Sequence, residues 1–453
     1  MAPKVPGTLV VLIAGQIAGG ISQRADGSLR FDYDRGYDGV PLSLNMPVSN
    51  ETFGDGLVRP YLAGLLPEDP RVRKEIAREH GVSANNPYAL VSVMGLDLPG
   101  AVQVCAEDSL SAVVEREESY VEISEKDIAA RLAAMSGPVA SSWFSAQEHW
   151  SLGGQQAKIA LARFEGRWYS CEGPAATTHI VKPGMRQLKC HALNEHFCLE
   201  LASACGIPTA GSEYVNFDGV PAVVVTRYDR IVHAPFVVER IHQEDLCQAL
   251  ATLPDNKYAD EGGPSARDII ALLDRFDGAA ENKVAFTRQL LFNYLIGATD
   301  AHAKNYSVLL MDAQPPTFAP MYDVASALTY DRNGRTVKLA MGIGGENRLG
   351  RVSETDLRRY ADMASLDADM VLEIAHDMAA EIPARAAELA DRLDAEGGTE
   401  LTGRLVPGIA ASCETARRTM RPKTAALDMA QAQRQAEALG RRSGPRQAPS
   451  RPR

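Results

Sequence analysis

The stretch Gly297-Ala298-Thr299-Asp300-Ala301-His302-Ala303-Lys304-Asn305 places an aspartate and an asparagine five positions apart. A mostly apolar run, Leu290 to Ile296, precedes it, and a second run, Val308 to Met311, follows it. This order predicts a helix end, then a loop, then a strand, with the polar side chains at an exposed rim. A further acidic residue, Asp323, follows in Pro320-Met321-Tyr322-Asp323. Together these residues indicate phosphoryl transfer from ATP.

The spacing of Asp300 and Asn305 is the one that protein kinases use in their catalytic loop. There the aspartate accepts the proton of the attacking hydroxyl and the asparagine holds magnesium. We therefore predict that Asp300 is the catalytic base. Asn305 and Asp323 are the predicted metal ligands, because magnesium prefers oxygen ligands and keeps several waters. A turn residue and a helix N-cap are the ordinary alternatives for these two. His302 and Lys304 either face phosphate or orient the loop.

Two charged residues are candidates for anchoring the nucleotide phosphates. Lys182 ends a predicted strand, His179 to Lys182, as the phosphate lysine of kinases does. Glu195 follows thirteen positions later, near the start of the predicted helix Asn194 to Cys205, and is its candidate partner. A lysine at a strand end is also a common solvated edge residue, so both interpretations of Lys182 stay open.

A loop with two glycines, Ser151 to Lys158, precedes another predicted strand. Glycines let backbone N–H groups approach phosphate closely, although this loop matches neither GxGxxG nor the P-loop pattern. A simple tight turn is the alternative. The candidate nucleotide-binding residues of this loop are Gly153, Gly154, Gln155, Gln156, Ala157 and Lys158. Thr226, Arg227 and Tyr228 follow an apolar strand and are the candidate hinge that reads adenine, or a plain strand end.

The composition favours a soluble cytoplasmic protein. Hydrophobic residues make up 45% and charged residues 23% of the 453 residues, as in ordinary globular proteins. The net charge of −11 argues against a general nucleic-acid binder. Seven cysteines without a CxxC pair predict reduced, buried thiols. The apolar run from Leu9 to Ile21 contains Gln16 and is too short for a membrane span, so we predict a β-hairpin there and no membrane partner.

The pattern along the chain predicts an α+β fold. Residues 1–110 form a small N-terminal α/β module, and residues 125–435 form a two-lobed, protein-kinase-like domain. Its N-lobe covers about 125–240 and its mostly helical C-lobe about 241–435. The Arg- and Pro-rich tail, 441–453, is predicted to be disordered. Other predictions are helices at Val58–Leu66, Pro70–His80, Asp127–Met135 and Lys283–Ile296, strands at Lys158–Ala162 and Ala222–Arg227, a surface connection at Glu107–Glu118 and a capping box at Ser353–Asp356.

Taken together, these motifs make the chain resemble the HipA-type serine/threonine kinases, the toxins of bacterial toxin–antitoxin pairs. The resemblance covers nearly the whole chain and depends on many ordered matches. In the N-terminal module the matches are Pro41-Leu42-Ser43-Leu44, Gly64-Leu65-Leu66-Pro67-Glu68 and Gly95 to Ala101. In the kinase part they are Ser151 to Lys158, Thr178 to Lys182, Asn194-Glu195, Arg227-Tyr228-Asp229-Arg230, Gln243 to Gln248, Gly262-Gly263-Pro264, Gly297 to Asn305 and Tyr322-Asp323.

The resemblance implies ATP and Mg²⁺ as cofactors and gives the base, the metal ligands, Lys182, the loop and the hinge the same roles. It places His302 beside the nucleotide. At Ser151 it places a regulatory serine that the kinase phosphorylates on itself, and the added charge should pull the loop away from ATP. The implied partner is a HipB-like helix-turn-helix antitoxin and, through it, operator DNA. The implied substrate is a translation-related protein such as an aminoacyl-tRNA synthetase, with persistence as the consequence.

Two other functions use the same residues. A kinase of a lipid or small molecule can carry the same catalytic loop, since that loop does not specify the acceptor. A non-catalytic co-repressor or scaffold bound to a helix-turn-helix partner is the second alternative. The N-terminal module favours the toxin kinase over the first, and the presence of Lys182, Asp300, Asn305 and Asp323 counts against the second.

Overall fold

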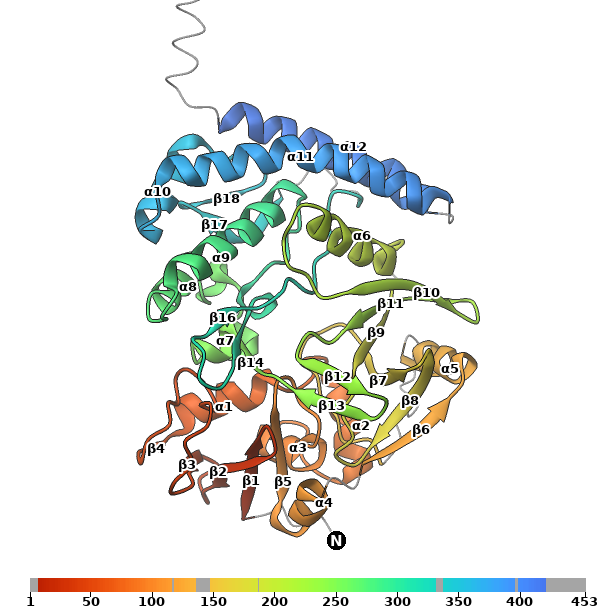
Figure 1. Cartoon of the computed structure of the whole chain (residues 1–453), viewed down its shortest axis with the longest axis vertical. Coiled ribbons are helices and arrows are strands. Elements are labelled where there is room, and N and C mark those ends of the chain that lie inside the picture. Colours follow the sequence, from red (N-terminus) through yellow and green to blue (C-terminus); the bar gives the residue numbers. More distant parts are fainter. Residues whose placement is uncertain are drawn as a thin grey trace, which may run out of the picture.

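The computed structural model describes residues 7–115, 118–135, 147–185, 187–330, 337–395 and 398–420. Three parts follow one another along its longest axis (Figure 1). A module with its own sheet lies at the N-terminal end, a second sheet lies in the middle, and long helices cover the far end. The predicted disordered tail and the part of the predicted C-lobe after residue 420 lie outside the described residues.

The N-terminal module is built on a five-stranded antiparallel sheet in the order β4-β3-β2-β1-β5. Helix α2 has the predicted bounds: Asp69 accepts the N–H of Arg71, Pro70 opens the helix, and Gly81 ends it with φ of +65°. Helix α1 begins three residues before its predicted start. The elements are β1 (Thr8–Ile13), β2 (Gln16–Gln23), β3 (Leu29–Tyr33), β4 (Thr52–Phe53), α1 (Asp55–Gly64), α2 (Pro70–His80), α3 (Pro87–Met94) and β5 (Val102–Ala106).

The described residues of the charged stretch after β5 are mostly exposed, as predicted for a surface connection, and they also form regular structure. The stretch contains a 3₁₀ turn, Glu107–Ser109, and a short helix, α4 (Leu110–Val114), whose Val113 is buried against Leu12 and Cys105. Burial of Val113, with Leu110 partly buried beside it, holds the segment on the sheet.

The N-lobe, residues 119–240, holds a six-stranded sheet in the order β10-β11-β9-β7-β8-β6. Strand β9 lies between β11 and β7, so Lys182 is inside the sheet and not at a solvated edge. The predicted strands are present with ends shifted by one or two residues. The elements are β6 (Ser119–Ile123), α5 (Glu125–Met135), β7 (Ile159–Phe164), β8 (Arg167–Glu172), β9 (His179–Pro183), α6 (His191–Ala204), β10 (Ser212–Phe217), β11 (Val220–Thr226), β12 (Arg230–Ala234) and β13 (Val237–Arg240).

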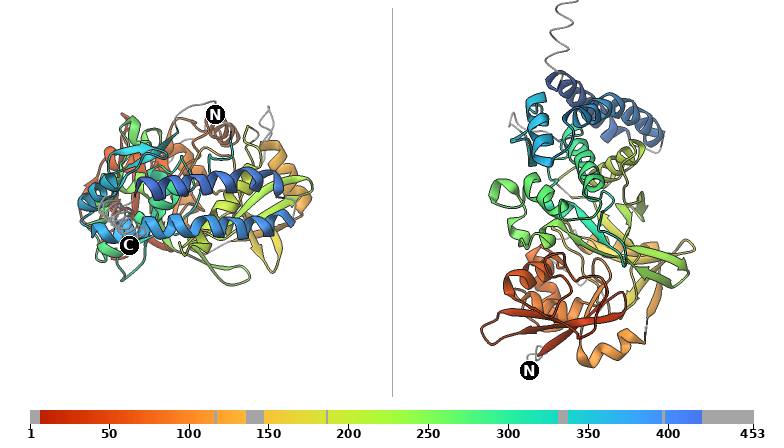
Figure 2. Two further views of the ribbon diagram at one scale, coloured as in Figure 1. Left: turned by 90° about the horizontal axis from the view of Figure 1, so that it is seen from above. Right: turned by 60° about the vertical axis from the view of Figure 1, so that its left-hand side comes forward.

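The C-lobe, residues 242–420, is mostly helical and is centred on α9, which is buried on most faces as predicted. Helices α11 and α12 run side by side over α9 and α6 (Figure 2). No helix of the described ranges is long and apolar enough to cross a membrane. The elements are β14 (His242–Asp245), α7 (Leu246–Ala249), α8 (Ala266–Leu273), α9 (Ala279–Leu295), β15 (Ser307–Leu310), β16 (Thr317–Phe318), β17 (Lys338–Ile343), β18 (Glu346–Arg348), α10 (Glu354–Ala364), α11 (Ala368–Ala395) and α12 (Thr399–Thr419), with 3₁₀ turns at Pro254–Asn256, Ala259–Glu261 and Ala303–Asn305.

The predicted capping box opens α10. The backbone N–H of Ser353 donates to the carboxylate of Asp356 over 2.9 Å. This bond satisfies a donor that the first helical turn would otherwise leave unpaired.

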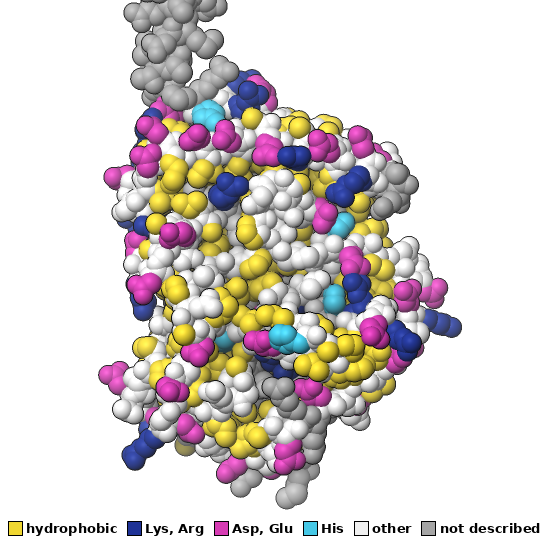
Figure 3. Space-filling model, in the orientation of Figure 1, with side chains coloured by type: hydrophobic (Ala, Val, Ile, Leu, Met, Phe, Trp, Pro, Cys, Tyr) yellow, Lys and Arg dark blue, Asp and Glu magenta, His cyan; other side chains and the backbone are white. Residues whose placement is uncertain are grey.

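A hairpin of β12 and β13 stands beside the N-lobe sheet. At its turn Phe236 has φ of +64°, a conformation that is unfavourable for a residue with a side chain. The Phe236 ring packs against Tyr120 and Phe164, with centroids 5.3 Å and 4.9 Å away. The outer side of the hairpin exposes Ile231 and Val232, and Figure 3 shows hydrophobic side chains gathered over it. Exposed apolar surface of this kind is typical of contact surfaces.

A buried carboxylate, Asp97, joins the N-terminal module to the N-lobe. It lies 3.2 Å from Arg227, 2.9 Å from Arg230 and 3.2 Å from Arg240, and it accepts the hydroxyl of Thr177 over 2.7 Å. Burial alone would raise the pKa of Asp97, but the three guanidinium groups outweigh it and hold that pKa well below its usual range. The ionised carboxylate therefore ties the two parts together.

A second polar contact joins the module to the C-lobe at Glu244. Its carboxyl accepts the hydroxyl of Ser43 and the N–H of Leu44, each over 2.7 Å. Nearby, the side chain of Gln248 donates to the carbonyl of Tyr61 over 3.0 Å. Burial raises the pKa of Glu244 from 4.5 to about 8, so the group is protonated at neutral pH.

The raised pKa of Glu244 gives stability a definite pH dependence. The folded chain keeps a proton that the unfolded chain releases above pH 4.5, so the free energy of unfolding falls as the pH rises from there toward about 8. Glu244→Gln mimics the protonated carboxyl and should remove this fall. Thermal unfolding from about pH 5 to about pH 9 tests the prediction, with the exposed Glu125→Gln as control. Parallel pH profiles for wild type and Glu244→Gln would contradict it.

Candidate functional site

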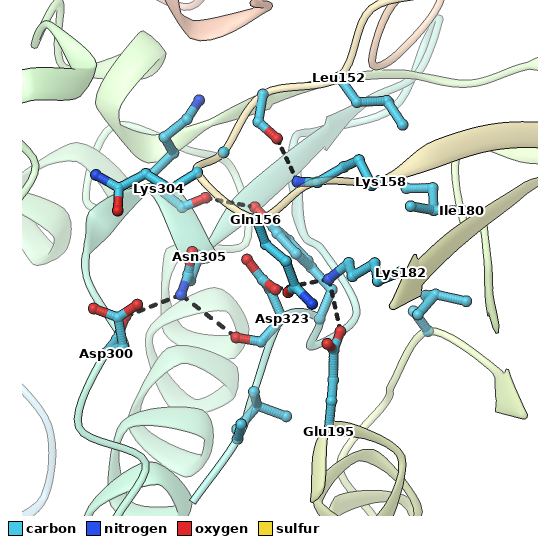
Figure 4. Close-up of a pocket in the computed structure, with 18 of the residues that line it drawn as sticks. Leu152, Gln156, Lys158, Ile180, Lys182, Glu195, Asp300, Lys304, Asn305 and Asp323 are labelled. Atoms are coloured by element: carbon cyan, nitrogen blue, oxygen red, sulfur yellow. Dashed lines mark hydrogen bonds and ion pairs between the residues drawn. The ribbon is translucent and has the colours of Figure 1, made fainter. Parts of the chain in front are cut away.

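One cavity lies where the N-terminal module, the N-lobe and the C-lobe meet, with a volume of about 500 Å³. Its walls come from the loop before β7, from β9 and α6, from the segment after β11, and from the loop between α9 and β15 (Figure 4). Ser151 and Ala157 are outside its lining. The predicted residues that line it are Gly153, Gly154, Gln155, Gln156, Lys158, Lys182, Glu195, Thr226, Arg227, Tyr228, Asp300, His302, Lys304, Asn305 and Asp323.

Lys182 is held between two carboxylates (Figure 4). Its Nζ lies 2.6 Å from Oε1 of Glu195 on α6 and 2.7 Å from Oδ1 of Asp323. The pairing predicted for Lys182 and Glu195 is thus formed. Burial disfavours the charge of Lys182, but Asp323 and Glu195 outweigh it and raise its pKa. The amine therefore stays charged in one position, as a contact to a phosphate oxygen requires.

Asp323 has a strained backbone, with φ of +55° in the left-handed region. Such conformations in residues with a side chain are concentrated at functional sites. Burial would raise the pKa of Asp323, but Lys182 and Lys158 hold it well below its usual range. The carboxylate is therefore ionised and directed to the cavity by a backbone that the surroundings must stabilise.

Asn305 ties the loop of Asp300 to the segment of Asp323. Its side-chain nitrogen donates to the backbone carbonyl of Asp300 over 3.0 Å and to that of Asp323 over 3.4 Å (Figure 4). The carboxylate of Asp300 itself is exposed at the rim, as predicted. Base candidate and metal-ligand candidates thus lie together although 23 positions of sequence separate the outermost two.

The donor set fits a magnesium ion. Both hydrogen bonds of Asn305 use its nitrogen, which leaves the amide oxygen as the atom that can ligate a cation. Magnesium is commonly bound by one or two protein groups together with phosphate and water, and Asn305 with Asp323 supplies these two groups. Within the described ranges, no cluster of three or more His, Cys, Asp or Glu residues is placed to form a protein-only metal site.

Lys304 and His302 differ in their surroundings. The Nζ of Lys304 donates to the carbonyl of Gly64 and to Asp245, each over 2.7 Å, so its charge is already matched by a carboxylate. His302 is buried, and its Nδ1 has no hydrogen-bond partner among the described residues. Burial lowers the pKa of His302 despite the nearby Asp300, which favours a neutral ring. Of the two, Lys304 has a structural contact that joins the loop of residues 297–305 to the module.

The phosphate loop, residues 151–158, needs both glycines. A Cβ on Gly153 would lie 2.5 Å from the carbonyl of Gly64, and Gly154 has φ of +104°. Lys158 donates to the carbonyl of Gly153 over 2.6 Å. Burial, followed by the charge of Lys182, lowers the pKa of Lys158 from 10.5 to about 8. Its amine faces the cavity bonded to a carbonyl, with no carboxylate of the described residues at salt-bridge distance, and so is suited to receive a phosphate.

The start of the phosphate loop is fixed to the N-terminal module. Ser151 is 1% exposed, its hydroxyl donates to the carbonyl of Leu65 over 2.8 Å, and its N–H donates to the carbonyl of Asp97 over 3.0 Å. In this conformation the Ser151 hydroxyl is not accessible to a phosphoryl donor. Further along the loop, Gln156 donates to the carbonyl of Pro183 over 2.9 Å.

The candidate adenine hinge is partly committed to other contacts. The N–H of Thr226 donates to Gly211 and that of Arg227 donates to Thr178. The side chain of Arg227 points into the Asp97 cluster. An adenine contact from this segment would therefore use carbonyl oxygens or the N–H of Tyr228.

Some residues in or beside the cavity carried no assigned chemistry in the sequence. Tyr258 donates its hydroxyl to Oδ1 of Asp300 over 2.8 Å, and Lys257 pairs with Glu68 over 2.6 Å. Gly64 and Glu68 bring the N-terminal module into the cavity wall. Gly64 and Glu68 belong to the matched segment Gly64 to Glu68, which indicates a family but not a contact, whereas Lys257 and Tyr258 lie outside the matched segments.

The chain is similar to known proteins over most of its length. Family models match residues 9–105 as a HipA N-terminal domain and residues 150–386 as a HipA-like C-terminal domain. A relative from Sinorhizobium fredii, "Putative kinase Y4mE", is 35% identical and covers 79% of this chain and 86% of its own. The "Serine/threonine-protein kinase toxin HipA" of Shewanella oneidensis is 28% identical, covering 80% and 84%.

A solved structure has the same fold. It is the Shewanella oneidensis complex of HipA, HipB and operator DNA, with a TM-score of 0.78 and 26% identity over 90% of this chain and 97% of that chain. This confirms the predicted fold, a kinase-like domain preceded by a sheet module. This chain therefore belongs to the HipA-like kinase family.

Proposed function

We propose that this kinase is a serine/threonine protein kinase that uses ATP and Mg²⁺. The observation that carries the proposal is the contact of Lys182 with both Glu195 and Asp323, in a cavity that also contains Asp300 and Asn305. Phosphoryl transfer requires a fixed cation, an oxygen-rich metal site and a base at one place, and these residues meet that requirement.

In the proposed reaction, Asp300 accepts the proton of a serine or threonine hydroxyl while the oxygen of that hydroxyl bonds to the γ-phosphorus of ATP. The bond from that phosphorus to the bridging oxygen breaks, and ADP leaves. Lys182 and Lys158 hold the phosphate oxygens and neutralise their charge. A magnesium ion held by Asn305 and Asp323 would supply further neutralisation of the phosphates.

We further propose that the kinase is the toxin of a cytoplasmic toxin–antitoxin pair. Support comes from the similarity to a HipA toxin and to a structure in which HipA is in complex with HipB and operator DNA. The proposed partner is accordingly a HipB-like helix-turn-helix antitoxin, and the proposed target is a translation-related protein. The partnership is tested by purifying this chain from its own cells: a small helix-turn-helix protein should co-purify with it, and its absence would contradict the partnership.

Ser151 is the proposed site of inhibitory self-phosphorylation. Its hydroxyl is buried and donates to the carbonyl of Leu65. A dianionic phosphate at this position has no proton to donate, so its negative charge would lie against the carbonyl oxygen without a hydrogen bond. The phosphorylated loop would have to leave this position, and Gly153 and Lys158 would leave the cavity with it.

Asp300→Ala should lower phosphoryl transfer by about 10² to 10⁴-fold, because the reaction loses its positioned base. Its exposed side chain makes the thermal unfolding temperature insensitive to the change. Transfer from radiolabelled ATP is the measurement, with the exposed Asp362→Ala on α10 as the matched control. A fully active Asp300→Ala protein would rule out the mechanism.

The depressed pKa of Lys158 predicts that nucleotide affinity depends on pH. The amine is charged below about 8 and neutral above it, so the affinity for a non-hydrolysable ATP analogue should fall as the pH rises through that value. Lys158→Arg keeps the charge and should flatten the profile. Isothermal titration calorimetry measures both proteins, and an equally steep profile in Lys158→Arg would exclude Lys158 as the titrating group.

Ser151→Ala and Ser151→Asp should separate the role of Ser151 as a phosphorylation site from the effect of negative charge at this position on nucleotide binding. The alanine variant should lose most self-phosphorylation and keep nucleotide affinity within about threefold, because it loses one ordinary hydrogen bond. The aspartate variant places a charge against the Leu65 carbonyl and should weaken nucleotide binding by about tenfold or more. Mass spectrometry and calorimetry are the measurements. An unchanged phosphopeptide pattern in Ser151→Ala would reject this site.

A further inference from the structure

The loop that connects α7 with α8, residues 250–265, is folded into a fixed shape beside the cavity. It contains two 3₁₀ turns, Pro254–Asn256 and Ala259–Glu261. A Cβ on Gly263 would lie 2.0 Å from the carbonyl of Asn256, so the chain can double back this closely only with glycine. The loop is also held to the C-lobe, because Asn347 donates to Asp260 over 3.0 Å.

This loop places Tyr258 on the proposed base. The Tyr258 hydroxyl donates to Oδ1 of Asp300 over 2.8 Å. The ring also meets His302 edge-on, with centroids 5.0 Å apart. Burial, followed by the charge of Asp300, raises the pKa of Tyr258, so the phenol is a protonated donor at neutral pH.

The neighbouring residue fixes Tyr258 from the other side. Lys257 is buried, and its Nζ lies 2.6 Å from Oε2 of Glu68 and 5.6 Å from the centre of the Tyr258 ring. Glu68 belongs to the N-terminal module, and its N–H donates to the carbonyl of Gly154 over 2.9 Å. Tyr258 is thus connected through two residues to the module and to the phosphate loop.

The hydrogen bond from Tyr258 to Asp300 has the length expected for the bond between a substrate hydroxyl and its base. A general base must accept a hydrogen bond from the acceptor hydroxyl over about 2.6–3.2 Å before it can take the proton. The Tyr258 hydroxyl makes that bond to Oδ1 already. A serine or threonine that uses the same oxygen has to displace it first.

We propose that Tyr258 is an acceptor gate: its hydroxyl holds the place of the substrate hydroxyl on Asp300, and the Lys257–Glu68 ion pair holds the gate closed. This inference rests on the proposed kinase function and names the residue that controls access to it. Both Tyr258 and Asp300 have solvent-accessible surface, so the bond is weak enough for a protein substrate to replace. A substrate that also contacts the 250–265 loop would open the gate most easily, which gives this loop a part in substrate selection.

The test is Tyr258→Phe, which keeps the ring and removes only the hydroxyl. With saturating Mg·ATP, kcat/KM for myelin basic protein as acceptor should rise about three- to tenfold, the effect of one hydrogen bond between partly exposed groups. ATP hydrolysis, with water as acceptor, should rise as well. The dissociation constant of a non-hydrolysable ATP analogue should not change. Tyr214→Phe removes an exposed phenol on β10 and is the matched control. It should leave kcat/KM, ATP hydrolysis and the dissociation constant unchanged.

Glu68→Gln provides a second variant, because it weakens the ion pair and leaves the Tyr258 hydroxyl in place. It should give a smaller rise than Tyr258→Phe. Damage to the fold lowers activity, so a rise cannot come from a merely structural effect. Unchanged or reduced transfer in Tyr258→Phe, with an active wild type, would overturn the gate and would make Tyr258 a residue that orients the base. No transfer or hydrolysis by any of the proteins, with analogue binding intact, would overturn the kinase proposal and the gate together.

Discussion

The buried carboxylate of Asp97 is the group on which the joined architecture depends. Removing one side of such a buried cluster leaves uncompensated charge, at a cost of about 3–5 kcal/mol. Its partners include Arg227, which follows β11 in the cavity wall, and Arg230, which opens β12. Its backbone carbonyl accepts the N–H of Ser151. One residue of the N-terminal module therefore positions the candidate hinge and the start of the phosphate loop. The module thus contributes to the walls of the candidate site and is not an appended unit.

Of the four lysines that line the cavity, the three that the sequence marked as candidate site residues have different environments. Lys182 and Lys304 are each bonded to carboxylates, so their positions are fixed and their charges are matched. Lys158 is bonded to a carbonyl, and its lowered pKa reflects a charge that burial disfavours. A bound polyphosphate would relieve that unfavourable charge. The site is in this sense incomplete without an anion, whereas the two paired lysines keep its shape before the anion arrives.

Much of the fold and of the candidate site could be predicted because the signals are local. Five-residue spacing identified Asp300 with Asn305, and periodicity identified the strand that ends at Lys182. The contacts that could not be predicted join residues far apart in sequence: Tyr258 meets Asp300 across 42 positions, and Lys304 meets Asp245 across 59. A sequence states which groups can form hydrogen bonds, but the partner depends on how distant elements pack. The open question of whether Lys182 is a solvated edge residue was likewise settled by strand order.

Because Ser151 donates to Leu65 and Glu68 donates to Gly154, displacement of the N-terminal module would also displace the loop that the proposed nucleotide contacts. Linkage is reciprocal: if a bound nucleotide were to multiply the docking constant of the module by some factor, release of the module would divide the nucleotide affinity by the same factor. A protein that binds only the outer surface of the module and displaces the module would thereby lower nucleotide affinity without entering the cavity. The N-terminal module would thus be a surface through which a partner regulates the proposed nucleotide site from a distance.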